Sequence, residues 1–198
     1  RVEATGYGGV DGMRYMRGNL SKKTIAIQGF GNGGAYAALQ LAREGAIVTH
    51  ISDRTIALYK AGGLSLEELT PMVDWSNHRT QGGVLINYFL QGRINARPLG
   101  KFDINDPEIG KSERANEIIG AQVDILALAA LENQLRLDNV DLVKAKTVVE
   151  FGNGSIDKEA EIKLYERGIE VLHDTLVNAG GVTVSSFETE QAVTGKWL

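Results

Sequence analysis

The sequence predicts an α/β fold, with a doubly wound, mostly parallel sheet of the Rossmann dinucleotide-binding type. Short strand patterns alternate with helical patterns along the chain, which is typical of βαβ units. The first strand pattern runs directly into a glycine-rich loop at residues 29–34 and then into a helical pattern. The next strand pattern ends close to an acidic residue, Asp53. These features together predict a nucleotide site at the carboxyl edge of the sheet.

The first half of the chain contains two strand patterns and three helical ones. In chain order the expected elements are a leading helical segment at 1–20, a strand at 24–28, a helix at 33–44, a strand at 46–51 and a helix at 65–73. Tyr36 and Leu39 belong to a helically spaced apolar set in the second of these helices. Ser65 is the expected N-cap of the third, and Glu67 and Glu68 lie in its first turn, where acidic side chains are favourable.

The second half repeats the alternation of strands and helices. The expected elements are strands at 123–127, 147–150 and 169–172 and helices at 157–167 and 183–193. Asp157 is the expected N-cap of the first helix, and Gly168 ends it. Residues 75–111 carry loop residues with little periodicity, so we expect an insertion or loop between the two halves of the sheet. The 198 residues are thus interpreted as a single dinucleotide-binding domain.

Composition excludes several other classes of protein. The net charge of −4, without a cluster of Lys and Arg, argues against a nucleic-acid surface. The absence of cysteine excludes disulfides and thiolate metal sites, and His50, His78 and His173 form no i,i+4 pair, so no metal site is expected. No apolar run reaches the ~18 residues of a membrane span, and no signal peptide is visible. We therefore expect a cytoplasmic protein without membrane contact. Because the chain begins at Arg1 without a methionine, it is expected to be a piece of a larger protein.

The glycine-rich loop fits the pattern G-x-G-x-x-G. It reads Gly29-Phe30-Gly31-Asn32-Gly33-Gly34, placed between a strand and a helix as dinucleotide binding requires. Gly29 is expected to allow a tight turn, Gly31 to let the backbone approach a pyrophosphate, and Gly34 to allow close helix–strand packing. The helix N-terminus supplies N–H groups and a positive dipole end to the phosphates.

The choice between NAD and NADP depends on residues at the end of the second strand. The Asp53 carboxylate can accept hydrogen bonds from an adenosine ribose, and its charge would repel a 2′-phosphate, which favours NAD. Ser52 and Arg54 flank it and could bind that phosphate, so NADP stays open.

A second strand-to-glycine junction occurs at residues 147–156, "TVVEFGNGSI". It lacks the third glycine and lies in the second half, so it is not the phosphate loop. A doubly wound sheet brings both strand ends to one crevice. Asn153 is therefore either near the nicotinamide half of the cofactor or the cap of a turn.

Three stretches of the chain resemble the cofactor-binding domain of the glutamate dehydrogenase family. They are "EATGYG", "IQGFGNGGAYAA" and "KAKTVVEFGNGSIDKEAEIKLYERGIEVLHDTLVNAGGVTVSSFE". Within the family, which includes leucine, phenylalanine and valine dehydrogenases, "VTVSSFE" is similar to the glutamate branch. The resemblance covers the chain from Arg1 to about Gln191, apart from residues 75–111.

The resemblance implies further site residues. Thr5 matches a threonine near the nicotinamide carboxamide, and Ser185 matches a serine that holds the side-chain carboxylate of the substrate. The remaining matches are residues beside the cofactor, namely Ala129 and Ala130 near the ribose and Asn153 and Asn178 near the nicotinamide. The implied partners are a dinucleotide cofactor and L-glutamate or 2-oxoglutarate, and the intact enzyme is implied to be a homo-oligomer.

Some residues depart from the family pattern. Leu128 occupies a position where the family usually has proline. Phe151-Gly-Asn-Gly-Ser155 occupies the positions where the family usually has Gly-Ala-Asn-Gly-Pro, so Phe151 is expected to narrow the site. The family's catalytic lysine and aspartate lie in motifs of an N-terminal substrate domain that this sequence lacks, so no catalytic residue is assigned. Two alternatives remain: a free-standing nucleotide-binding or regulatory module without catalysis, and a leucine- or valine-type dehydrogenase domain, which Ser185 disfavours.

Overall fold

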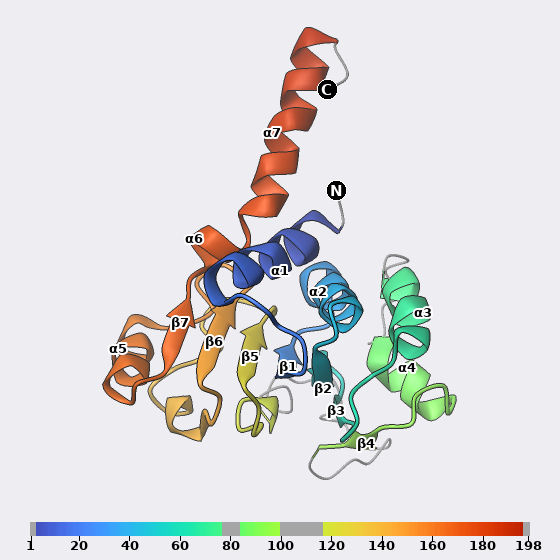
Figure 1. The fold of residues 1–198 in the computed structure, drawn as a ribbon, viewed down its shortest axis with the longest axis vertical. Coiled ribbons are helices and arrows are strands. Elements are labelled where there is room, and N and C mark those ends of the chain that lie inside the picture. Colours follow the sequence, from blue (N-terminus) through green and yellow to red (C-terminus); the bar gives the residue numbers. More distant parts are fainter. Residues whose placement is uncertain (1–2, 77–83, 100–116, 196–198) are drawn as a thin grey trace.

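A seven-stranded sheet forms the centre of the protein, with strand order β4-β3-β2-β1-β5-β6-β7 (Figure 1). The computed structural model describes residues 3–76, 84–99 and 117–195. The strands are β1 (Thr24–Gln28), β2 (Ile47–Ser52), β3 (Ala57–Tyr59), β4 (Arg97–Pro98), β5 (Ile125–Leu128), β6 (Thr147–Glu150) and β7 (Glu170–Leu172). The helices are α1 (Ala4–Arg17), α2 (Asn32–Arg43), α3 (Leu66–Ser76), α4 (Val84–Leu90), the 3-10 turn η2 (Val140–Leu142), α5 (Lys158–Glu166), α6 (Asp174–Val177) and α7 (Ala179–Thr194).

The strand order confirms the predicted doubly wound fold. Strands β2, β1, β5, β6 and β7 pair in parallel, and β1 lies between β2 and β5, so the chain reverses its direction of winding at this point. Strands β3 and β4 are antiparallel and extend the sheet beyond β2. A crevice is expected at the carboxyl ends of β1 and β5, where the winding reverses.

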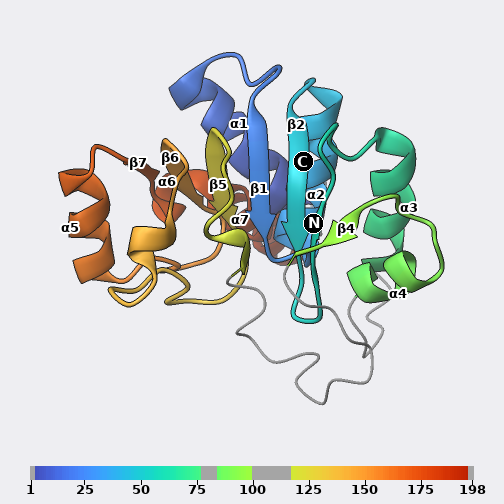
Figure 2. The same cartoon turned by 90° about the horizontal axis from the view of Figure 1, so that it is seen from below.

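Apolar side chains of the central strands alternate between two hydrophobic cores. Ile25 and Ile27 belong to the core shared with α1, α2 and α3, whereas Ala26 belongs to the core shared with η2 and α5. Figure 2 shows α3 and α4 beside the β2–β4 edge of the sheet and α5 beside β7. Both faces of a parallel sheet must be covered in this way, which explains the continuous apolar runs in its strands.

Local capping signals in the sequence are present in the structure. The Glu68 N–H donates to Ser65 Oγ at 3.3 Å, and the Glu68 carboxylate accepts the Ser65 N–H at 2.8 Å, which forms a capping box before α3. The Asp157 carboxylate accepts the Lys158 N–H at 3.0 Å, and Gly168 after α5 has a φ of 70°. The predicted starts of these two helices are therefore confirmed.

The structure differs from the sequence prediction in several segments, and β3 and α6 are elements that the sequence analysis did not predict. Residues 75–111, expected as an insertion or loop, contain α4 and β4 in their described part, whereas residues 77–83 and 100–116 lie outside the described residues. The last helix begins at Ala179, four residues before the predicted start, and so includes Gly180 and Gly181. A Cβ on Gly180 would lie 2.4 Å from the Ala4 carbonyl oxygen, so close packing against α1 decides this helix start against the low helix propensity of glycine.

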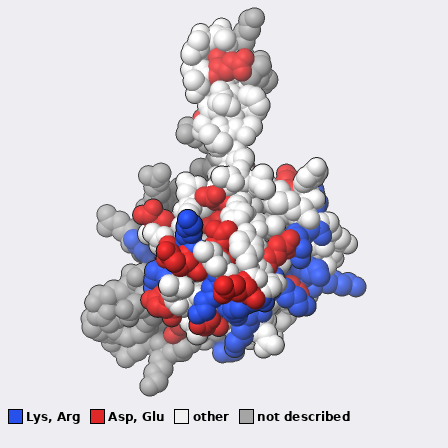
Figure 3. Space-filling model, turned by 90° about the vertical axis from the view of Figure 1, so that its left-hand side faces the viewer, with Lys and Arg blue, Asp and Glu red and all other residues white. Residues whose placement is uncertain are grey.

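Helix α7 extends away from the body of the protein (Figure 1). None of its residues is buried, and Val182, Phe187 and Val193 are exposed. On the face drawn in Figure 3, Lys and Arg side chains are interspersed with Asp and Glu over the body, and α7 projects from it. No helix in the described ranges is long and apolar enough to cross a membrane.

His50 is a buried histidine on β2 that pairs across the sheet with Tyr59 of β3, which in turn pairs with Arg97 of β4. It is 8% exposed, its Nδ1 lies 2.8 Å from Thr49 Oγ1, and its ring lies 4.6 Å from that of Tyr59. The Arg97 guanidinium lies 4.5 Å from the centre of the Tyr59 ring. Burial, together with the charge of Arg97, lowers the pKa of His50 to about 4.

We expect His50 to make the stability of the fold depend on pH. Below its ordinary pKa of about 6.5 the unfolded chain binds a proton at this residue, whereas the folded chain stays neutral until about pH 4. The free energy of unfolding should therefore fall by roughly 2 kcal/mol from this residue as the pH drops from about 7 to about 5. Urea unfolding of the parent and of His50→Gln at both pH values measures this contribution of His50. An equal change in the free energy of unfolding between the two pH values in both proteins would contradict it.

Candidate functional site

The glycine-rich loop lies between β1 and α2, at the carboxyl edge of the parallel strands. Gly29 has a φ of 93°, its N–H donates to the Ser52 carbonyl oxygen at 2.9 Å, and a Cβ on it would lie 2.5 Å from the Ala129 carbonyl oxygen. A Cβ on Gly34 would collide with the Gly29 carbonyl oxygen. Both positions therefore require glycine for the turn and for the close approach of α2 to the strands.

Gly31 is different, because it faces open space. It is the N-cap residue of α2, and no atom of the described residues lies within 4 Å of the position that a Cβ would occupy. Phe30 beside it is 3% exposed and belongs to the core, and Asn32 is exposed. Gly33 lies near Thr5 of α1, with 3.8 Å from its Cβ position to Thr5 Cγ2. Gly31 thus leaves room for a group at the N-terminus of α2, where N–H groups lack intrahelical partners.

An open cleft of about 450 Å³ is lined in part by Thr5, the α1 residue that lies near Gly33 of this loop. Its lining comes from α1, from the loops after β5 and β6, and from the α6–α7 junction: Thr5, Ala130, Phe151, Gly152, Asn153, Asn178, Gly181 and Val182. The structure therefore brings together four predicted site residues that are far apart in the sequence. Ala129 does not line the cleft but packs behind the glycine loop, 3.1 Å from the Cβ position of Gly34.

A second, wider cleft of about 570 Å³ shares Ala130 and Asn153 with the first. It is lined by the loop after β5 through Glu132, Asn133, Gln134 and Arg136, none of which the sequence analysis assigned. Their only sequence signal is their place after the carboxyl end of a strand, where ligand-binding loops of such sheets occur.

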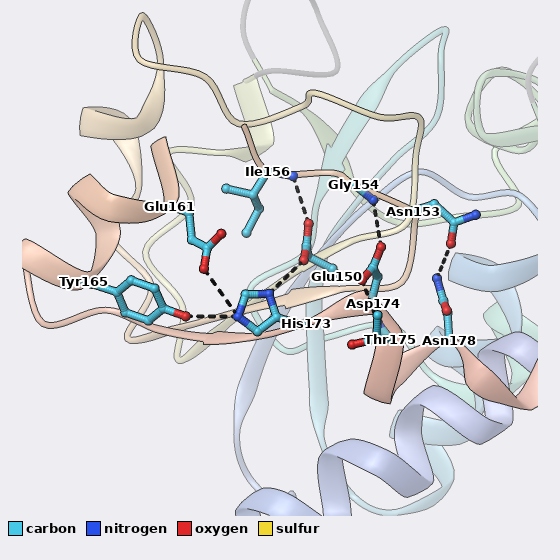
Figure 4. A network of polar contacts seen from close by, with 10 residues as sticks. All are labelled: Glu150, Asn153, Gly154, Ile156, Glu161, Tyr165, His173, Asp174, Thr175 and Asn178. Carbon is cyan, nitrogen blue, oxygen red and sulfur yellow. Dashed lines mark hydrogen bonds and ion pairs between the residues drawn. The ribbon is translucent and has the colours of Figure 1, made fainter. Parts of the chain in front are cut away.

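Asn153 and Asn178 form a hydrogen-bonded pair at the edge of the first cleft (Figure 4). Asn178 Nδ2 donates to Asn153 Oδ1 at 2.6 Å and lies 3.4 Å from the Phe151 carbonyl oxygen. Within the described residues the Asn153 amide nitrogen and the Asn178 amide oxygen make no further hydrogen bond. The pair thus offers one donor and one acceptor, the complement of a carboxamide.

Phe151 is one of the residues that line the first cleft, but its ring packs beneath α1. It is 4% exposed, and its ring would lie 2.3 Å from a Cβ on Gly9, so glycine in α1 makes room for it. The ring fills the space beneath α1, and the expectation that Phe151 narrows the site stays a prediction.

Asp53 has structural partners at the end of β2. Its Oδ1 accepts the Thr55 N–H at 2.8 Å, the Thr55 hydroxyl at 2.5 Å and the Ile56 N–H at 3.1 Å, and its Oδ2 accepts the Leu85 N–H at 3.0 Å. It is 8% exposed. The carboxylate therefore closes a turn and binds α4, so the free acceptor expected for a ribose is largely occupied.

The neighbours of Asp53 differ from one another in exposure. Ser52 is fully buried, and its hydroxyl has no partner among the described residues, so the expected contact of Ser52 with a 2′-phosphate is not supported. Arg54 is exposed.

Ser185 lies on α7, one helical turn after Gly181, which lines the first cleft. Ser185 does not itself line that cleft.

A buried carboxylate, Glu150, anchors the loop that carries Asn153 (Figure 4). It is 4% exposed, accepts the Ile156 N–H at 2.9 Å and lies 3.5 Å from His173 Nδ1. His173 Nε2 lies 3.0 Å from the Tyr165 hydroxyl and 3.4 Å from the Glu161 carboxylate. Burial raises the pKa of Glu150, and the nearby carboxylate of Asp174 adds to this. This network was not apparent from the sequence.

The histidines are not arranged as metal ligands in the described part of the chain, which contains no group of three or more His, Asp or Glu able to hold a metal ion. His50 lies on β2 and His173 follows β7, with β1, β5 and β6 between these two strands in the sheet, and His78 lies outside the described residues.

Comparison with known proteins gives matches along the whole chain. Residues 1–198 match the Glutamate/Leucine/Phenylalanine/Valine dehydrogenase family. The chain is 38% identical to a glutamate dehydrogenase of Thermotoga maritima over 171 residues, which cover 86% of this chain and 35% of that protein. It is 34% identical to the NADP-specific glutamate dehydrogenase of Synechocystis sp., with 98% of this chain and 43% of that protein covered.

The fold is also similar to that of a solved glutamate dehydrogenase. The crystal structure of the hetero-hexameric glutamate dehydrogenase from Thermus thermophilus in its Leu-bound form superposes with a TM-score of 0.73 at 26% identity, covering 100% of this chain and 42% of that one. The chain thus spans less than half the length of each of these proteins.

Proposed function

The chain belongs to the glutamate/leucine/phenylalanine/valine dehydrogenase family, and from this premise we propose that it is the dinucleotide-binding domain of a glutamate dehydrogenase. The observation that carries the proposal is the open space at Gly31, at the N-terminus of α2, together with the cleft lined by Thr5, Asn153 and Asn178. Glutamate dehydrogenases among the relatives support the substrate class.

Each part of the site has a distinct role in this proposal. The backbone of residues 29–34 and the N-terminus of α2 would hold the pyrophosphate. The donor and acceptor of the Asn153–Asn178 pair would orient the carboxamide of the nicotinamide, with Thr5 beside them. When bound, the dinucleotide supplies the hydride chemistry, and the protein supplies binding and orientation.

The proposed cofactor is NAD, with NADP as the alternative. The negative charge of Asp53 lies close to the expected ribose position at the end of β2, which favours a free 2′-hydroxyl over a phosphate. The NADP-specific relative from Synechocystis sp. and the exposed side chain of Arg54 favour the alternative. Titration with NADH and NADPH decides between them.

The proposed substrate pair is L-glutamate and 2-oxoglutarate, bound with the help of Ser185. A hydroxyl on α7, one turn beyond the cleft, could donate to the side-chain carboxylate of a substrate held by a second domain. We propose an N-terminal substrate domain as the partner, because the relatives are more than twice as long as this chain. We also propose an oligomeric enzyme, because the glutamate dehydrogenase from Thermus thermophilus is a hetero-hexamer. A leucine- or valine-type dehydrogenase domain and a free-standing nucleotide-binding module are the alternative functions.

We expect the chain by itself to bind NADH but not to oxidise glutamate at a useful rate. Acid–base assistance contributes ~10²–10⁴ in rate, and no catalytic base is assigned to this chain. NADH production from glutamate is measured with the chain alone and after addition of the substrate domain of a relative. Rescue by the added domain supports the proposed function. Rapid turnover by the chain alone would contradict the divided site, and absence of NADH binding would contradict the function itself.

A further inference from the structure

Helix α6 holds the Asn153 loop at two points (Figure 4). At its first residue, Asp174 Oδ2 accepts the Gly154 N–H at 2.9 Å. Immediately after its last residue, Asn178 donates to Asn153 Oδ1 at 2.6 Å. A short helix that follows β7 therefore determines where the loop after β6 lies.

Gly154 is also hydrogen-bonded to the loop after β5, which lines the second cleft. Its carbonyl oxygen accepts the Asn133 N–H at 2.9 Å, and its φ of 55° is a left-handed conformation that favours glycine. Gly154 is thus bonded both to α6 and to the loop after β5, and its N–H bond to Asp174 is one of the contacts that orient the residue before it, Asn153.

The bond between Asp174 and the next residue of α6 does not by itself require a carboxylate at position 174. Asp174 Oδ1 accepts the Thr175 N–H at 2.6 Å, which a serine or threonine hydroxyl could also do. The negative charge has an electrostatic cost, since it lies close enough to buried Glu150 to add to the rise in the pKa of that carboxyl, which burial mainly causes. A second acceptor oxygen, aimed at Gly154, is what the carboxylate adds.

We propose that Asp174 is a positioning residue for the nicotinamide end of the cofactor, acting on Asn153 through the Gly154 N–H. This inference rests on the proposed function. Loss of the bond between Asp174 and the Gly154 N–H frees the peptide between Asn153 and Gly154 to rotate. The Asn153–Asn178 pair then no longer presents its donor and acceptor in one fixed arrangement. Because the glycine loop is untouched, binding of the ADP-ribose half should not change.

The test compares NADH with ADP-ribose, which lacks the nicotinamide. Asp174→Ala in the 198-residue chain should weaken NADH binding about tenfold, the effect of one charge-assisted hydrogen bond, and change ADP-ribose binding less than about twofold. Asp174→Asn retains one acceptor oxygen and should show a smaller loss. Asp157→Ala, which removes the side-chain cap of α5 at a residue that lines neither cleft, is the matched control and should bind both ligands like the parent.

The outcomes separate the inference from the function on which it rests. Unchanged NADH affinity in Asp174→Ala would overturn the positioning role. Equal losses for NADH and ADP-ribose would overturn it as well, because they would indicate a general structural defect. If the parent chain binds neither ligand, the proposed function fails and the positioning role falls with it. A selective loss for NADH in both Asp174 variants, at a melting temperature near that of the parent, supports it.

Discussion

Gly31→Val is expected to abolish measurable dinucleotide binding while leaving the fold intact. The valine side chain would occupy the open space at the N-terminus of α2 in which we place the pyrophosphate. The backbone of Gly31, with φ −86° and ψ −164°, lies in the extended region that a β-branched residue adopts without strain. Overpacking of this kind lowers affinity by at least roughly 100-fold, which moves binding out of the range of the titration.

The matched control is Gly62→Val. Gly62 also faces open space among the described residues, but it lies in the loop between β3 and α3, away from both clefts. NADH fluorescence titration and thermal unfolding are measured for both variants and the parent. Parent-like NADH affinity in Gly31→Val would refute the assignment of the loop, and a large loss of stability in that variant would show that Gly31 has a packing role.

Asp53→Ala should lower the free energy of unfolding by roughly 3 kcal/mol, because it leaves buried donors without an acceptor. The N–H groups of Thr55, Ile56 and Leu85 all donate to this carboxylate. The bond to Leu85 also connects β2 to α4, so the N-terminal part of α4 should open first. Urea unfolding monitored by circular dichroism measures the loss.

Two further variants make this prediction specific. Asp53→Asn retains one carbonyl oxygen, but its amide nitrogen would face an N–H donor, so an intermediate loss is expected. Asp138→Ala removes an exposed aspartate paired with Arg136 and should change the stability by less than about 1 kcal/mol. If Asp53→Ala instead retains the parent's stability and alters the preference between NADH and NADPH, the carboxylate serves the ribose.

Features that depend on neighbouring residues could be predicted from the sequence. The caps at Ser65 and Asp157 act within a few residues, Gly34 approaches the carbonyl oxygen of Gly29 across one strand–helix turn, and Gly29 has a positive φ of its own. The alternation of strands and helices was sufficient for the doubly wound sheet, since parallel strands need crossover helices.

Features that depend on distant contacts could not be predicted in this way. The structural role of Asp53 depends on the hydrogen bond that it accepts from the Leu85 N–H, 32 residues further along the chain. The helical start of α7 at Ala179 follows from its contact with α1, where Gly180 approaches Ala4. Local propensity gives the opposite expectation in the second case, because glycine disfavours helix unless packing requires its small size.

The sequence by itself determined the family of the protein, its sheet and its glycine loop, because these depend on short-range patterns and specific residue strings. Only the tertiary structure decided which side chains meet. It placed Thr5, Ala130, Asn153 and Asn178 around one cleft, and it directed the Asp53 carboxylate toward backbone donors. The physical reason is that side-chain hydrogen bonds need partners within about 3 Å, a condition that spacing along the chain does not set.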